Sequence, residues 1–166
     1  MLSRTHRGRW LRRSLLGGLL AAGLVALTAA PAFAASLTNI SWTVSNSQTG
    51  KTGVTYAYAF KTATTGTIKT VTMTVPAGTG GAVAVGTVYG LGAGTVSLAA
   101  NTLTYTVTSA VSVPANIPIY VSFTGLTNTA TAGSYTSTIT TQTSVPATID
   151  TGTSPAVTVG GIGGEK

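Results

Sequence analysis

The sequence predicts an all-β protein, folded as a single antiparallel sandwich of about eight or nine strands. Two observations support this prediction. First, large or apolar residues alternate with small or polar residues along nearly every segment after residue 34, which is the period of a β-strand. Second, clusters of Gly, Pro, Asn and Ser separate these segments, and no long window after residue 34 carries an apolar stripe at helical spacing.

Residues 1–34 have the three parts of a secretory signal peptide. Five arginines and the only histidine lie within the first thirteen residues, and an apolar run follows at residues 15–30. Ala32 and Ala34 form an A-x-A cleavage site, so we expect cleavage between Ala34 and Ala35. The general secretory route is favoured, and a pair of arginines leaves the twin-arginine route open. An uncleaved anchor is the alternative, but the apolar run is shorter than the roughly 20 residues that span a bilayer.

Removal of the signal peptide changes the electrostatic character of the chain. The full chain has a formal charge of +7, but residues 35–166 contain four lysines, one aspartate and one glutamate, which gives +2. A nearly neutral protein lacks the basic surface that attracts phosphate backbones, so we expect no nucleic-acid partner. The chain has no cysteine, and its core must therefore hold the fold without disulfides.

The predicted strands fill one domain at residues 35–160, and a flexible glycine-rich tail follows at residues 161–166. Apolar residues alternate at residues 40–44, the even positions of residues 54–60 are large and apolar, and the odd positions of residues 117–123 are apolar. The other strands are expected at residues 68–75, 82–88, 94–99, 102–108, 134–141 and 154–159.

Threonine occupies every second position of three predicted strands, at residues 70–76, 102–108 and 135–141. Its branched Cβ suits a pleated surface, so the simplest interpretation is the wet, uncharged outer face of a sheet. Three other interpretations remain open. The hydroxyls could bind ice, which needs a regular repeat that this chain lacks, they could carry O-linked sugars, or they could assist aromatic rings in binding carbohydrate.

Two tyrosines are the candidate ligand contacts. Tyr120 breaks the apolar alternation of its strand, and Tyr89 lies beside a glycine-rich loop. Tyr56, Tyr58 and Tyr105 instead share faces with aliphatic residues, which assigns them to the core. We therefore predict exposed rings at Tyr89 and Tyr120, where they could stack on the faces of sugars.

The residues after position 34 lack the side chains of most catalytic sites. They contain no histidine and no cysteine, which excludes Ser-His-Asp and Cys-His arrangements and removes the usual zinc and copper ligands. Asp150 and Glu165 are the only carboxylates, too few for calcium and poorly placed for glycoside hydrolysis. The sequence predicts no enzyme, no metal and no cofactor. A covalent cross-link between Lys61 or Lys69 and Asn128, promoted by a buried Asp150, is the one reaction left open.

A family resemblance is carried by two segments, VTYAYAFKTATTGTIKTVTMTVPAG and NTLTYTVTSAVSVPANIPIYVSFTGLTNTATAGSYTSTITT. They resemble a widespread class of bacterial secreted and cell-surface domains, over about residues 52–142, which include a hairpin at residues 125–135. The resemblance implies an immunoglobulin-like or adhesin-like β-sandwich and leaves the function open. The alanine- and arginine-rich signal is similar to those of actinobacteria.

These observations together predict a secreted, non-catalytic protein with a structural or adhesive role, released or held loosely at the cell envelope. The alternative is a carbohydrate-binding module for cell-wall or environmental polysaccharide. Cell-wall glycan and other surface proteins are the expected partners, and no stable membrane span is expected once the signal peptide is removed.

Overall fold

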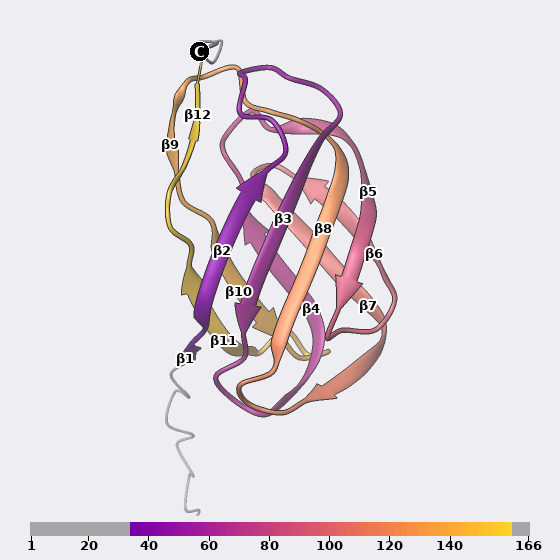
Figure 1. Cartoon of the computed structure of the whole chain (residues 1–166). Coiled ribbons are helices and arrows are strands. Elements are labelled where there is room, and N and C mark those ends of the chain that lie inside the picture. Colours follow the sequence, from indigo (N-terminus) through magenta and orange to yellow (C-terminus); the bar gives the residue numbers. More distant parts are fainter. Residues whose placement is uncertain (1–33, 161–166) are drawn as a thin grey trace, which may run out of the picture. The chain divides into compact units, whose positions relative to one another are not determined.

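The computed structural model describes residues 34–160, and their regular structure consists of β-strands (Figure 1). The all-β class predicted from the alternation is therefore confirmed. The predictions for the signal peptide before Ala34 and for the tail at residues 161–166 lie outside the described residues. The strands are β1 (Ala35–Ser36), β2 (Thr38–Val44), β3 (Val54–Lys61), β4 (Gly66–Thr74), β5 (Gly80–Tyr89), β6 (Gly94–Ala99), β7 (Thr102–Val113), β8 (Pro118–Thr127), β9 (Gly133–Tyr135), β10 (Thr138–Gln142), β11 (Thr148–Thr153) and β12 (Val157–Val159).

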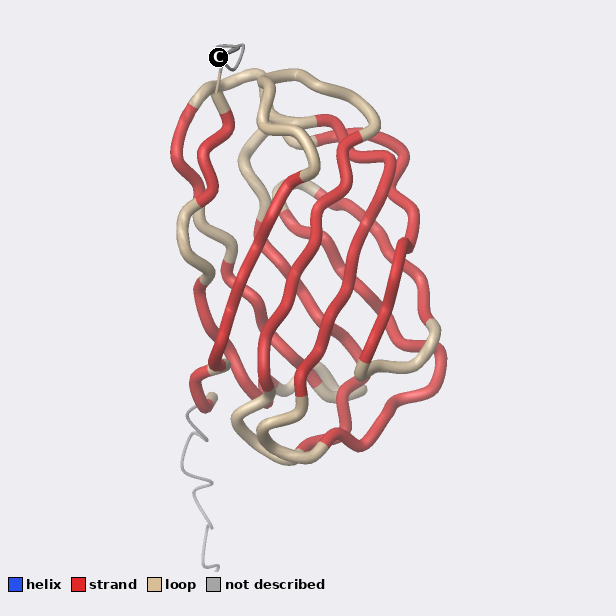
Figure 2. The backbone as a smooth tube through the Cα atoms, in the orientation of Figure 1, coloured by secondary structure: helices blue, strands red, loops and turns tan. Residues whose placement is uncertain are grey.

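Two larger sheets contain most of these strands, and they pack face to face (Figure 2). One sheet has the order β1-β11-β10-β4-β7-β6, and the other has the order β2-β3-β8-β5. A third, two-stranded sheet pairs β12 with β9. The strands pair antiparallel except β1 and β11, which pair parallel.

The core lies between the two larger sheets and uses the faces that the alternation predicted. In β3 every even position is buried, and Tyr56 and Tyr58 are fully buried. Tyr105 of the six-stranded sheet meets Phe123 of the four-stranded sheet, with ring centroids 6.1 Å apart. Trp42 stacks on Tyr58 at 6.2 Å, which closes the core on the side of β2. Aromatic packing between sheets therefore replaces the disulfides that the chain lacks.

The structure has twelve strands in its described part, more than the eight or nine that we predicted. The segment at 134–141 is divided between β9 and β10, because the chain changes partner at Ser137. There the backbone N–H donates to Ser154 Oγ at 3.0 Å and the side chain donates to Thr74 O at 2.6 Å. The predicted strand at 154–159 is shortened to β12, and β11 before it was not predicted.

Asn128 closes the end of the core where β8 ends. Its side-chain amide donates to the backbone oxygens of Asn46 and Gln48, at 2.8 and 2.7 Å, and its Oδ1 accepts a bond of 2.9 Å from Tyr56. All of its side-chain polar atoms are thus engaged inside the protein, where Asn128 is 1% exposed. Asn128 holds the loop between β2 and β3 against the end of β8.

The two faces of the sheets should respond differently to truncation. We expect Phe60→Ala to cost about 3–5 kcal/mol of unfolding free energy, because Phe60 is buried and its loss leaves a cavity. Thr104→Ala, on the outer face of β7, should cost about 0.5 kcal/mol, the scale of a cross-strand threonine pair. Urea unfolding of both variants measures the difference, and equal losses would contradict the assignment of the faces.

High pH should destabilise the protein through its buried phenols. Burial raises the pKa of Tyr56 and of Tyr58 above the ordinary value, because the phenolate would lose its hydration. A raised pKa in the folded state means that stability is fully present below about pH 10, where the unfolded phenols titrate, and is lost as the pH rises further.

Tyr58→Phe isolates this effect, because the Tyr58 hydroxyl has no hydrogen-bond partner among the described residues. We expect this variant to be as stable as the parent at pH 7, since it removes an unsatisfied buried group. It should lose less stability than the parent between pH 9 and pH 11, as measured by urea unfolding at each pH. A parallel loss in both proteins would show that other groups control the alkaline transition.

Candidate functional site

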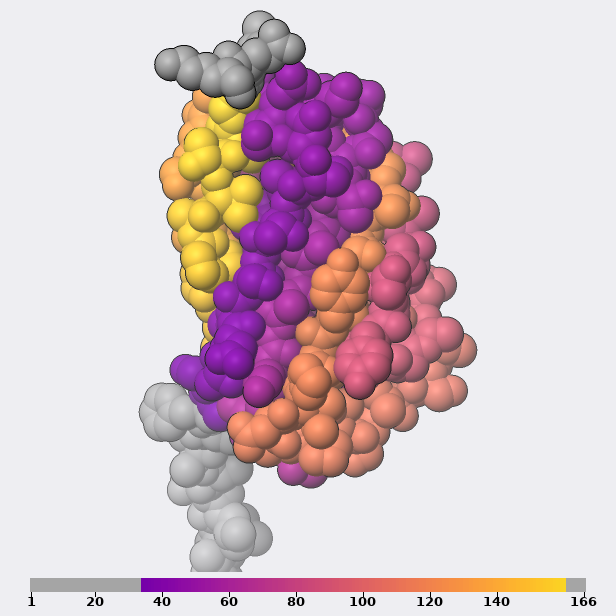
Figure 3. Space-filling view, in the orientation of Figure 1, coloured from indigo at the N-terminus to yellow at the C-terminus, as the bar shows by residue number. Residues whose placement is uncertain are grey.

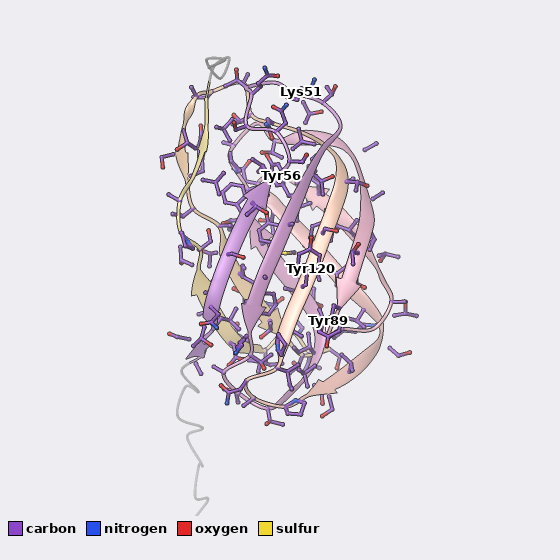
Figure 4. All side chains as sticks on the ribbon, in the orientation of Figure 1. Lys51, Tyr56, Tyr89 and Tyr120 are labelled. Carbon is purple, nitrogen blue, oxygen red and sulfur yellow. The ribbon has the colours of Figure 1, made fainter. Side chains whose placement is uncertain are left out.

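Tyr89 and Tyr120 lie side by side on the outer face of the four-stranded sheet (Figure 4). They are cross-strand partners in the β5–β8 ladder, and their side chains are 64% and 37% exposed. The prediction that these two rings are exposed is therefore confirmed, and the register adds that they are neighbours. Cross-strand partners have Cβ atoms about 4.5–5.5 Å apart, so the two side chains leave the sheet from neighbouring positions. We call the part of this face that carries Tyr89 and Tyr120 the tyrosine surface.

A β-bulge in β5 turns Tyr89 outward. Val85 pairs with Phe123 and Val88 pairs with Val121, so β5 has one more residue than β8 between these two pairs. Strict alternation would place Tyr89 on the inner face with Val85, but the extra residue reverses the parity and sends Val88 inward instead. The exposure of Tyr89 thus depends on the bulge.

Ser122 holds this bulge from the neighbouring strand. Its hydroxyl accepts a bond of 2.8 Å from Thr87 N, a backbone group that the bulge removes from the ladder. A Cβ at Gly86 would lie 2.6 Å from Ser122 Oγ, so the position next to the hydroxyl has room for glycine only. Ser122, two residues after Tyr120 on β8, therefore holds the bulge that places Tyr89 beside Tyr120.

Small side chains surround the rings on the same face. The ladders align Ser41, Ala59, Tyr120 and Tyr89 in one row across the four strands. Figure 3 shows this face, which is formed by β2, β3, β8 and β5 in that order. Lys61 is the one charged residue of these strands. The rings consequently stand on an almost neutral surface of small side chains.

The threonine rows cover the outer face of the other large sheet. Strand register aligns them across five strands, although the sequence has no repeat. One such row consists of Thr151, Thr140, Thr72, Thr104 and Ser97. The hydroxyls of the first two lie 3.1 Å apart and form a hydrogen bond. The threonines are half-buried by one another, which is the packing that favours threonine pairs in a sheet.

This arrangement favours the interpretation of the rows as a wet face. Neighbouring strands rotate by about 20–25° in a twisted sheet, so the rows do not form the flat array that ice binding requires. Cross-strand hydrogen bonds such as that between Thr138 and Thr153 engage part of the hydroxyls within the sheet itself. The tyrosine surface is therefore the stronger candidate for ligand contact.

The residues of the predicted covalent cross-link do not meet. Asn128 follows the last residue of β8, whereas Asp150 accepts bonds from Ala63 and Thr64, in the loop that follows β3 beside the first residue of β8. A strand of ten residues separates these ends of the domain. Lys69 is engaged elsewhere, since its Nζ donates to the backbone oxygens of Val107 and Thr108. The cross-link hypothesis is wrong for these residues.

An open hollow of about 360 Å³ lies at residues 44–48, and its lining contains no titratable side chain. Within residues 34–160, no group of three His, Cys, Asp or Glu side chains is placed to hold a metal ion. That part of the chain also has no helix with the length and hydropathy of a membrane span.

Comparisons of this chain with protein-family models, curated proteins and solved structures found no match. The resemblance to bacterial surface domains therefore stays a prediction, and the tyrosine surface is the feature of the fold that bears on function.

The bulge that positions Tyr89 can be tested by paired substitutions. We expect Gly86→Ala to cost about 1–3 kcal/mol through overpacking against Ser122. Ser122→Ala should cost about 1–2 kcal/mol because Thr87 N loses its acceptor. The double variant should cost less than the sum, because removal of the hydroxyl relieves the clash. Gly80→Ala in the same strand is the matched control, since its Cβ would meet nothing within 4 Å. Additive losses in urea unfolding would contradict the coupling.

Proposed function

We propose that this chain is a secreted, non-catalytic adhesive protein of the cell envelope or its surroundings, and that it binds glycan on the tyrosine surface of its four-stranded sheet. One observation carries this proposal: Tyr89 and Tyr120 are neighbouring exposed rings in a domain whose other tyrosines in β3 and β7 are buried. Large exposed rings on one face of a sheet are suited to contact a partner.

Neutral polysaccharide is the ligand class that fits this surface. Sugar rings have apolar faces that stack on aromatic side chains, and their hydroxyls need polar partners at the rim. Ser41 and Lys61 provide such groups on the same face as the tyrosine pair. The single cation on these strands offers little attraction for a highly charged polymer, so a polyanionic ligand such as nucleic acid is disfavoured.

The side chains available within residues 34–160 also favour binding over catalysis. Asp150 is the one carboxylate side chain within residues 34–160, it is buried, and those residues contain neither histidine nor cysteine. A pair of acids, a nucleophile with its base, or a metal site cannot be assembled from this set. We propose an immunoglobulin-like or adhesin-like fold with an adhesive role. The threonine face then keeps the exported domain soluble without charged side chains.

Loss of either ring should weaken retention on insoluble glycan. We expect Tyr89→Ala and Tyr120→Ala each to weaken a pull-down on insoluble cell-wall polysaccharide or cellulose by about tenfold, the value of one stacked ring. Tyr89→Phe should retain binding, because the ring remains. Soluble sugar from the same polymer should compete with the parent protein.

Two control variants keep this test specific. Val145→Ala removes an exposed apolar side chain from a loop outside the tyrosine surface and should bind like the parent. The triple variant Thr102→Ser, Thr104→Ser and Thr106→Ser keeps the hydroxyls on the other sheet and should also bind. A folded triple variant that no longer binds, beside ring variants that still do, would overturn the proposed site in favour of the threonine face.

A further inference from the structure

Asp150 is a buried carboxylate that the fold satisfies only in part. It is 0% exposed, and its Oδ2 accepts bonds of 3.0 and 3.1 Å from the backbone N–H groups of Ala63 and Thr64. Its Oδ1 is equally buried and has no hydrogen-bond partner among the described residues. An uncompensated buried charge is strongly destabilising, so this oxygen calls for a cationic donor.

None of the lysines in the described part of the chain supplies that donor. Lys69 Nζ donates to two backbone oxygens of β7. Lys61 follows the buried Phe60 and so points to the outer face of the four-stranded sheet. Lys51 lies at the far end of the domain from β1, as Figures 1 and 4 together show.

Ala35 lies opposite Asp150 on the neighbouring strand β1. Ala35 and Asp150 are Cα partners in the parallel ladder of β1 and β11, so their side chains share the inner face. Leu37 N donates to Thr151 O at 2.9 Å. In a parallel ladder the residue two positions earlier directs its own nitrogen to the same strand, which points the nitrogen of Ala35 at β11.

We propose that the α-ammonium group of Ala35, created by removal of the signal peptide, binds Asp150 Oδ1 and completes this site. Hydrolysis of the bond between Ala34 and Ala35 adds one water, leaves a carboxylate on Ala34, and frees an amine that takes up a proton at neutral pH. The ammonium then offers three N–H donors where the intact peptide offered one. This proposal rests on the proposed secreted function, and on cleavage between Ala34 and Ala35 during export.

Processing is thereby coupled to the stability of the domain. Before cleavage, the domain folds with an unsatisfied carboxylate, and the same residues are less stable. After cleavage, a cation and an anion meet inside the protein, where their interaction is weakly screened. The processed form is the stable one. This suits the general secretory route that we favour, on which a chain stays unfolded until it has crossed the membrane.

Defined N-termini test this pairing without dependence on cleavage in the cell. Three proteins ending at Lys166 are compared: one begins at Ala35 with a free amine, one begins at Ala34, and one begins at an acetylated Ala35. The first should melt about 5–10 °C above the other two at pH 7. The Ala34 protein differs by one alanine and keeps an ammonium group, so it controls for charge and length.

The same three N-termini in a D150N background complete the cycle. The amide removes the buried charge, so the advantage of the free Ala35 amine should disappear. If D150N does not fold, the melting temperatures of the three proteins with Asp150 are measured against pH, and this pH dependence alone tests the pairing.

Within residues 34–160, Asp150 is the one titratable side chain that faces Ala35, because β2, β10 and the loop at residues 62–65 contain none. Pairing raises the pKa of the amine above its ordinary value of about 7.7–8.0. The advantage should therefore be complete below about pH 8 and should vanish as the pH rises through the raised value, relative to the acetylated protein.

Equal melting temperatures for the three N-termini at pH 7, or an advantage that survives to pH 11, would overturn the pairing. The intact mass of the protein secreted by its host separately reports the cleavage position. A mass that begins at Ala35 with no effect of the free amine refutes the pairing alone. A mass that begins elsewhere refutes the processing, and with it the biological role of the pairing, even if the amine stabilises the purified domain.

Discussion

The register of β8 is the constraint on which the rest of the structure depends. This strand lies between β3 and β5, and its alternation places Ile119, Val121 and Phe123 in the core and Tyr120 outside. The pairing with β5 contains the bulge, which the hydroxyl of Ser122 stabilises and which brings Tyr89 beside Tyr120. Because a slip of one residue would exchange the two faces, the core and the tyrosine surface are determined by the same pairing.

Much of this arrangement could be predicted from the sequence because alternation is a local signal. The burial of Tyr56, Tyr58 and Tyr105 and the exposure of Tyr120 follow from which neighbours share their parity. The exposure of Tyr89 was predicted from the glycine loop beside it, although its immediate cause is the bulge. The bulge itself could have been suspected from Gly86 within an apolar strand, where glycine often marks such an irregularity.

The features that were missed depend on contacts between residues that are distant in the sequence. The strand β11 contains Asp150 and Gly152, both unfavourable in strands, and its pairing with β1 crosses more than a hundred residues. The breaks at Ser137 and Ser154 replace ladder bonds by side-chain bonds, which no alternation pattern reveals. The threonine rows were recognised strand by strand, but their alignment across five strands is a property of the register.

The chain has few charged side chains after residue 34, so each of them can have a distinct structural effect. No charged residue occurs between Lys69 and Asp150, so threonine has to keep the outer face of the six-stranded sheet wet. Asp150 is buried in a protein with few charged side chains, so its position calls for a specific structural explanation. Asp150 binds the loop after β3 through one oxygen and faces the first strand through the other. Its position links the packing of the two larger sheets to Ala35, the residue at which we propose that the processed chain begins. The ammonium group created by this proposed cleavage carries the charge that the site lacks.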